Sequence, residues 1–361
     1  MNPDHFAIVI GLSRYSEFRP AADLAGPEND ANGIVDWLED PNGGGLPVPN
    51  IKLITSSSYP PPKDEPWPGH LEREAFEWIE GLAQTNVAAM KGRNVGERLY
   101  FYASGHGFST DRREGCLLTA NANAVKATAN IGVTAWLRWW QDAGYFREYV
   151  LLLDCCMNRM SIAVPSPPPI APESTMAPPG PTFVAYAAKR PLKAIERPVS
   201  HGGTMKVHGV FTWTFLDGVK GAAANAQGLV TGQTMAAWLR NALRARLAKA
   251  DQENREVSQE PEIIDENPAL VLARPGTGFG FEVNFVFPAD AQGETAQLWS
   301  GVPLSAEEFK TTAMMTRRLR PGLYLIEVAA KGYRQSFTIV ESNSLPITEM
   351  GLTLPRTSIQ F

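Results

Sequence analysis

Two apolar runs decide the fold of this chain: Leu99-Tyr-Phe-Tyr-Ala-Ser-Gly-His106-Gly107 and, 50 residues further on, Tyr149-Val-Leu-Leu-Leu-Asp154-Cys155-Cys156. Each run has the length and apolar content of a buried strand, and each stops abruptly at polar, reactive side chains. In an open, mostly parallel α/β sheet, ligands bind beyond the carboxyl ends of the strands. If the two strands are neighbours, His106 and Cys156 meet at that edge.

A thiol beside an imidazole predicts nucleophilic catalysis, because the histidine can hold or remove the thiol proton. Two cysteines stand at the end of the second run. Successive side chains of a strand point to opposite faces, so only one of them can face His106. The pattern therefore indicates a cysteine peptidase with a single nucleophile.

Ser104-Gly-His106-Gly107, followed by Asp154-Cys-Cys156, resembles the caspase-like peptidases, specifically their metacaspase and bacterial branch. The distance from histidine to cysteine agrees with that in caspases. The cysteine motif follows the metacaspase style, with an aspartate, a small residue and then the nucleophile. The resemblance therefore makes Cys156 the nucleophile, with His106 beside it, and leaves Cys155 as the small residue.

Other segments extend the resemblance over residues 5–273. Leu24-Ala-Gly-Pro-Glu-Asn-Asp30-Ala is similar to a segment near the start of the family fold, and His208-Gly-Val-Phe-Thr-Trp to one in the small portion. Two departures concern the shape of the substrate site. Met157-Asn-Arg stands where the family commonly has His-Ser-Gly, and Pro27 stands where it often has cysteine.

The resemblance also implies roles for five residues. The backbone N–H groups of Gly107 and Cys156 would form the oxyanion hole. Asp30, Ser104 and Asp154 would form an acidic S1 site that takes Arg or Lys. An aspartate at the end of an apolar strand is costly to bury unless it is paired, and a guanidinium can bind it bidentately. We therefore expect cleavage after Arg or Lys of a protein or peptide substrate, not after Asp.

Composition is that of a globular protein, with 44% hydrophobic and 20% charged residues. A net charge of only −5 gives no reason to expect nucleic acid or a membrane as partner. Three cysteines cannot form a secreted disulfide framework, and the first residues lack a basic leader, so we expect a cytoplasmic protein. No cofactor is expected, and no metal site, since the residues after His106 carry no dense acidic cluster.

Strand and helix patterns alternate through most of the chain, which predicts a mostly parallel sheet flanked by helices. Helices are expected from Pro27, over 71–82, over 135–143 and over 235–247, and a last strand over 268–273. Residues 161–181 contain eight prolines and no aromatic residue, so they predict a loop between the large and small portions.

From residue 275 the pattern changes to short, alternating strands, expected over 296–300, 311–319, 323–329 and 335–340. The chain is therefore expected to divide into a peptidase domain, 1–274, and a β-sandwich domain, 275–361, which resembles small Ig-like or PEGA-type modules. The sandwich is a candidate site for an activating partner.

Three functions stay open on the sequence alone. The protein is an active endopeptidase that matures a partner in a bacterial regulatory or defence pathway, or a catalytically silent scaffold that acts through its sandwich, or an acyltransferase or other thiol enzyme. The presence of both His106 and Cys156 favours an enzyme. His201 and His208 are competing bases, but neither follows an expected strand, so structural or exposed roles are favoured for them. Cys116 is expected to be a small buried apolar residue.

Overall fold

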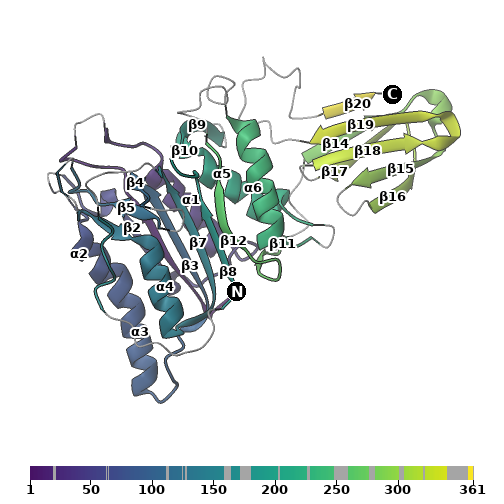
Figure 1. The fold of residues 1–361 in the computed structure, drawn as a ribbon. Helices are drawn as coiled ribbons and strands as arrows, with labels where there is room; N and C mark the ends of the chain where they lie inside the picture. The colour runs from purple at the N-terminus through teal and green to yellow at the C-terminus, as the bar shows by residue number, and fades with distance from the viewer. Residues whose placement is uncertain are drawn as a thin grey trace.

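The computed structural model of the protein describes residues 1–18, 22–61, 63, 65–110, 114–123, 125–126, 128–157, 164–170, 180–201, 204–225, 228–247, 259–275, 281–300, 305–319, 322–339 and 357–360. Its main element is a six-stranded sheet in the order β12-β8-β7-β3-β1-β2 (Figure 1). The strands span His5–Gly11 (β1), Ile51–Thr55 (β2), Gly96–Gly105 (β3), Phe146–Cys155 (β7), Thr182–Tyr186 (β8) and Glu262–Glu266 (β12). The first five pair in parallel, and β12 runs antiparallel at one edge.

Helices cover both faces of this sheet, because its strands are apolar on both sides. Along β1, Ile8 and Ile10 join one buried cluster, and Ala7 and Val9 join the other. The helices that pack on the first face are α2 (Pro68–Leu71), η4 (Glu72–Phe76), α3 (Glu77–Ala88) and α4 (Val133–Ala143). Those on the second face are α1 (Pro27–Glu39), α5 (Val210–Asp217) and α6 (Gly232–Arg246).

Three small sheets surround the main one. The strands β4 (Gly107–Phe108), β5 (Cys116–Leu118) and β6 (Asn130–Gly132) form the first. The antiparallel hairpin of β9 (Glu196–His201) and β10 (Thr204–Gly209) leads directly into α5. The third pairs β11 (Val230–Thr231) with β13 (Val271–Ala273).

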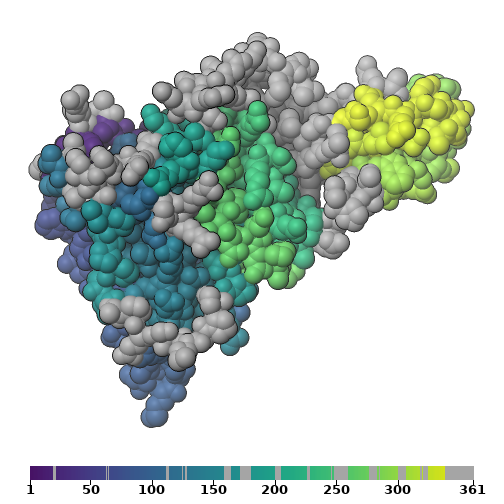
Figure 2. All heavy atoms as spheres, viewed as in Figure 1, coloured from purple at the N-terminus to yellow at the C-terminus, as the bar shows by residue number. Residues whose placement is uncertain are grey.

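The C-terminal strands form two further sheets, which gather in one lobe in Figure 2. One has the order β16-β15-β18-β19 and the other β17-β14-β20. Their bounds are Phe281–Val286 (β14), Thr295–Ser300 (β15), Ser305–Lys310 (β16), Met314–Leu319 (β17), Gly322–Val328 (β18), Tyr333–Ile339 (β19) and Thr357–Gln360 (β20). A separate buried cluster, which includes Val283, Phe285 and Ile326, lies among them. The division at residue 274 and a binding role for this region stay predictions.

The structure confirms the expected α/β class with a mostly parallel sheet. Two details differ from expectation. The strand expected over 268–273 is β13, which lies outside the main sheet, while the edge position is taken by β12. Glu262–Glu266 has acidic residues at both ends and is only half-buried, as suits an edge strand. Because an edge strand does not need a long apolar run, this sequence does not predict one. Most of the proline-rich segment 161–181 lies outside the described residues.

Candidate active site

The carboxyl ends of β3 and β7 place the two reactive residues together. These strands pair in register, with Ser104 opposite Asp154 and Gly105 opposite Cys155. His106 and Cys156 each follow the last paired residue of their strand, so they emerge side by side at one edge of the sheet. This edge is where ligands bind in open α/β sheets.

The imidazole of His106 is held by a backbone carbonyl. Its Nε2 donates to Ala22 O at 2.6 Å, because a carbonyl can only accept. The ring also lies against Tyr15, with ring centroids 4.6 Å apart, and the Tyr15 hydroxyl accepts from the His106 backbone N–H at 2.7 Å. With Nε2 carrying the hydrogen, the neutral ring presents Nδ1 as a proton acceptor.

The Cys156 thiol is partly buried and lies 4.0 Å from Ala194 O, to which it donates a weak hydrogen bond. Within the described residues it makes no hydrogen bond to His106. Catalytic hydrogen bonds are often long in unliganded enzymes and tighten when substrate binds. Burial raises the pKa of this thiol, and Asp154 and Glu196 add to the rise, while a backbone hydrogen bond at Ala194 and the charge of Lys193 act in the opposite direction.

Cys155 has a different environment from its neighbour. Its side chain is only 1% exposed and points to Cys116 O. A β-carbon on Gly107 would overlap the Cys155 sulfur, so the glycine after His106 is required by this close packing. Burial raises the pKa of the Cys155 thiol well above its ordinary value, which leaves it a small apolar residue.

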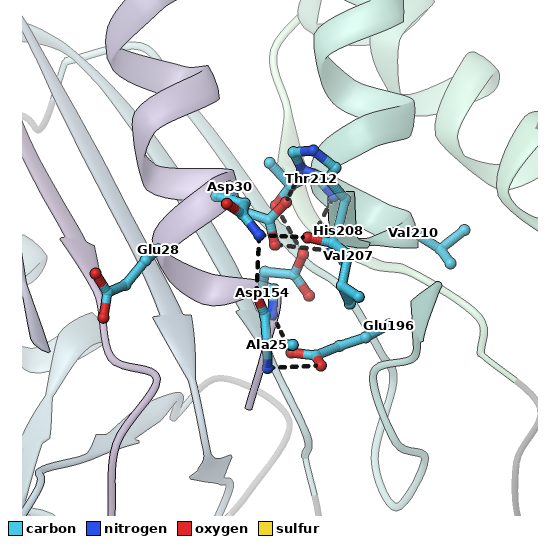
Figure 3. Close-up of polar contacts among 12 residues, drawn as sticks. Ala25, Glu28, Asp30, Asp154, Glu196, Val207, His208, Val210 and Thr212 are labelled. Atoms are coloured by element: carbon cyan, nitrogen blue, oxygen red, sulfur yellow. Dashed lines mark hydrogen bonds and ion pairs between the residues drawn. The ribbon is translucent and has the colours of Figure 1, made fainter. Parts of the chain in front are cut away.

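The three acidic-site residues of the sequence analysis also come together, as Figure 3 shows for Asp30 and Asp154. Asp30 lies on α1 and accepts from His208 Nδ1 and from the Gly209 N–H, both at 2.8 Å. Asp154 Oδ2 accepts from the Thr212 N–H at 3.2 Å and from the Thr212 hydroxyl at 2.7 Å. Ser104 is buried beside Asp154 in the register.

Gly209 stands between the two carboxylates. A β-carbon there would overlap Asp154 Oδ2 and lie 3.0 Å from Asp30 Oδ2. The two carboxyl groups are therefore close neighbours inside the protein, at 1% and 5% exposure. Burial raises the pKa of Asp30 well above its ordinary value. Burial, with Asp30 adding its charge, raises the pKa of Asp154 to about 7.

This shift predicts a stability that falls as pH rises. Asp154 ionises near pH 4 in the unfolded chain and about pH 7 in the folded one, so the folded state holds its proton more tightly. The cost of the buried charge is absent below the lower pKa and complete above the higher one. We expect Asp154→Asn to stabilise the protein by roughly 2–4 kcal/mol at pH 8.5 and little at pH 4. Thermal unfolding at both pH values checks this, with the exposed Asp36→Asn as control; a gain independent of pH would contradict it.

Two further residues, Glu196 and His208, lie at the acidic site, and neither is assigned to it from the sequence. Glu196 on β9 accepts from the backbone N–H groups of Ala25 and Gly26, at 3.2 and 3.1 Å, just before α1. His208, for which the sequence favours a structural or exposed role, contacts Asp30 through Nδ1. Both contacts join residues more than 170 positions apart, and a short-range motif carries no signal for them.

Among the described residues, no three histidine, cysteine, aspartate or glutamate side chains are arranged to hold a metal ion. In the same part of the chain, none of the helices has the length and apolarity to cross a membrane.

No protein-family model matches the chain. A probable protease from a Desulfuromonadales bacterium is 26% identical over an alignment of 240 positions, which covers 60% of this chain and 26% of that protein. The chain thus spans about a quarter of the length of the curated relative it matches. Among solved structures, caspase-1 from Spodoptera frugiperda is similar, with a TM-score of 0.47 and 10% identity over 77% of this chain and 93% of the other. The similarity to a probable protease supports the expected resemblance to peptidases.

Proposed function

We propose that this protein is a cysteine endopeptidase that cleaves after Arg or Lys through a His106–Cys156 dyad. The observation that carries the proposal is the position of His106 and Cys156 at one sheet edge. The buried carboxylate of Asp154 lies on the same strand, two residues before Cys156. The similarity to a probable protease supports the reaction class. By family resemblance, the substrate is a partner protein that is matured in a bacterial regulatory or defence pathway.

Because His106 Nε2 is bonded to Ala22 O, Nδ1 is the nitrogen proposed to exchange the proton with the thiol. As the Cys156 sulfur attacks the peptide carbonyl carbon, Nδ1 takes the thiol proton, and it then gives this proton to the leaving amine. Water cleaves the resulting thioester, which releases the acid and restores the thiol. The backbone N–H groups of Gly107 and Cys156 are proposed to stabilise the oxyanion.

The acidic site sets the proposed specificity. Asp30 and Asp154 lie close together in a low-dielectric setting, and after burial the charge of Glu196 contributes to the raised pKa of both aspartates. A buried cationic side chain would lower these raised pKa values by favouring ionised carboxylates. An anionic P1 aspartate would meet repulsion here. Hydrolysis of a P1-Arg peptide beside its P1-Asp twin tests this function, and equal or reversed rates would contradict the specificity.

The proposed specificity predicts an enzyme that works as a single, uncut chain. No Lys or Arg occurs between Met160 and Ala188, so an Arg/Lys-specific enzyme cannot cut its own proline-rich segment. Arg190 is followed by Pro191, which hinders cleavage there. We expect purified active protein to run as one band of 39.4 kDa on a denaturing gel. Two discrete fragments that appear with activity, and are absent from Cys156→Ala, would contradict this.

One observation favours a second candidate, a catalytically silent scaffold that acts through the C-terminal strands. Cys156 has a raised pKa and donates to Ala194 O, not to the imidazole. A scaffold would show no turnover of any peptide, and its Cys156→Ala variant would keep all partner binding.

A further inference from the structure

The carboxylate proposed to bind the substrate cation already has two donors. His208 Nδ1 contacts Asp30 Oδ1, and the Gly209 N–H contacts Oδ2, each at 2.8 Å. Both donors come from consecutive residues at the end of β10, and Asp30 is 1% exposed. With the side chain buried and a donor on each oxygen, a cation that binds Asp30 competes with these donors for it. The Gly209 donor belongs to the backbone, whereas the imidazole can rotate.

The β9–β10 hairpin makes further contacts with the start of α1 next to this one, and Figure 3 shows the contact of Glu196 with Ala25. Glu196 on β9 accepts from the Ala25 and Gly26 N–H groups, and Asn29 Nδ2 donates to Val207 O at 3.0 Å. These contacts do not involve the imidazole. The hairpin can therefore stay in place while the His208 side chain, which is 15% exposed, moves outward.

We propose that His208 is an internal ligand of the acidic site, whose imidazole competes with the substrate's Arg or Lys side chain for Asp30. The inference rests on the proposed function. Imidazole and guanidinium are both N–H donors to a carboxylate, but the guanidinium always carries its charge and binds bidentately. Burial, with Lys206 and Lys220, lowers the pKa of His208, so the resident imidazole is uncharged at neutral pH.

Such a ligand lowers the apparent affinity for the cation by the fraction of molecules in which Asp30 is free. It also gives the buried carboxylate a partner in the absence of substrate. Asp154 is arranged differently, because within the described residues both of its hydrogen bonds use Oδ2, which leaves Oδ1 for the incoming cation. In this proposal the substrate therefore competes with a resident side-chain donor at Asp30 and has a free oxygen at Asp154.

Binding of agmatine, a guanidinium probe that mimics an arginine side chain, tests the proposal without hydrolysis. Titration calorimetry would use the full chain carrying Cys156→Ala, at pH 7.5. Adding His208→Ala should tighten agmatine binding by about tenfold, as expected when a hydrogen bond to a charged group no longer has to be broken. His208→Gln, which keeps a side-chain donor, should bind more weakly than His208→Ala. Met205→Ala, an exposed change in the same hairpin, should have no effect.

Unchanged or weaker binding by folded His208→Ala, or no binding by any variant, would overturn the proposal. A second measurement leaves His208 in place, in case its replacement prevents folding. In the chain with ¹⁵N-labelled histidines, saturating agmatine should shift the His208 Nδ1 resonance as the bond to Asp30 breaks, and an unmoved resonance would refute the displacement. If His208→Ala tightens agmatine binding while P1-Arg peptides stay uncut by the wild type, the proposed function fails and the internal ligand stands.

Discussion

Cys156→Ala is expected to abolish cleavage of a P1-Arg peptide, with kcat reduced by roughly 10⁴-fold or more. The variant lacks the sulfur that forms the acyl-enzyme, and within the described residues the sheet edge offers His106 no second thiol. Cys155 is buried against Gly107 and Cys116, on the opposite face from Cys156. Initial rates of a fluorogenic peptide measure the loss, and circular dichroism verifies that the variant is folded.

Cys155→Ala is the matched control, since it removes the adjacent sulfur and leaves the dyad. The change opens a small gap beside Gly107, so we expect a modest loss of stability and activity within about fivefold of wild type. If Cys155→Ala were inactive and Cys156→Ala active, the nucleophile would be Cys155 and the proposed assignment to Cys156 would be wrong. If neither change affected the rate, the reaction would not be thiol catalysis.

The central strands could be predicted because their signal is local. β1, β3 and β7 are apolar runs, buried on both faces, and their burial does not depend on which neighbour they pair with. The hairpin β9–β10 is not apparent from the sequence because its strands hold few apolar residues. Val199 is the one aliphatic residue of Glu196–His201, and only Met205 and Val207 are apolar in Thr204–Gly209. Such segments become strands through their pairing and their contacts with α1, which only the folded chain provides.

The candidate site likewise contains residues that could be placed from a local sequence signal and residues that could not. His106 and Cys156 could be placed together because each directly follows a strand, and parallel neighbours end at the same edge. The acidic residues were assigned by family resemblance, and the structure adds that Asp30 and Asp154 share Gly209 as a spacer. The partner of the imidazole is a backbone carbonyl, Ala22 O, which any residue type supplies. No side-chain pattern could have indicated it.

The second large effect is expected from Asp30→Asn, which should lower kcat/KM for a P1-Arg peptide by roughly 10²- to 10³-fold, as when one partner of a buried charge pair is lost. The amide keeps the shape of the carboxylate and can still accept from Gly209 N–H, so the hairpin contact survives. The change removes the charge that is proposed to bind the cation, and it replaces the oxygen that accepts from His208 Nδ1 with an NH2 group. Rates at several concentrations of P1-Arg and of a neutral P1-Gln peptide measure the change.

The ratio of the P1-Arg rate to the P1-Gln rate distinguishes a role of Asp30 in binding the cation from a purely structural role. If Asp30 only holds the β9–β10 hairpin in place, its replacement disturbs the site for every substrate, and the P1-Arg and P1-Gln rates fall together. If it binds the cation, the P1-Arg rate falls alone, and the ratio of the P1-Arg rate to the P1-Gln rate becomes smaller. Asp36→Asn, an exposed change on the same helix, controls for the loss of one negative charge from α1. Because the Asp154 carboxylate remains, Asp30→Asn should retain some preference for Arg, and only the variant with both aspartates replaced should lose it entirely.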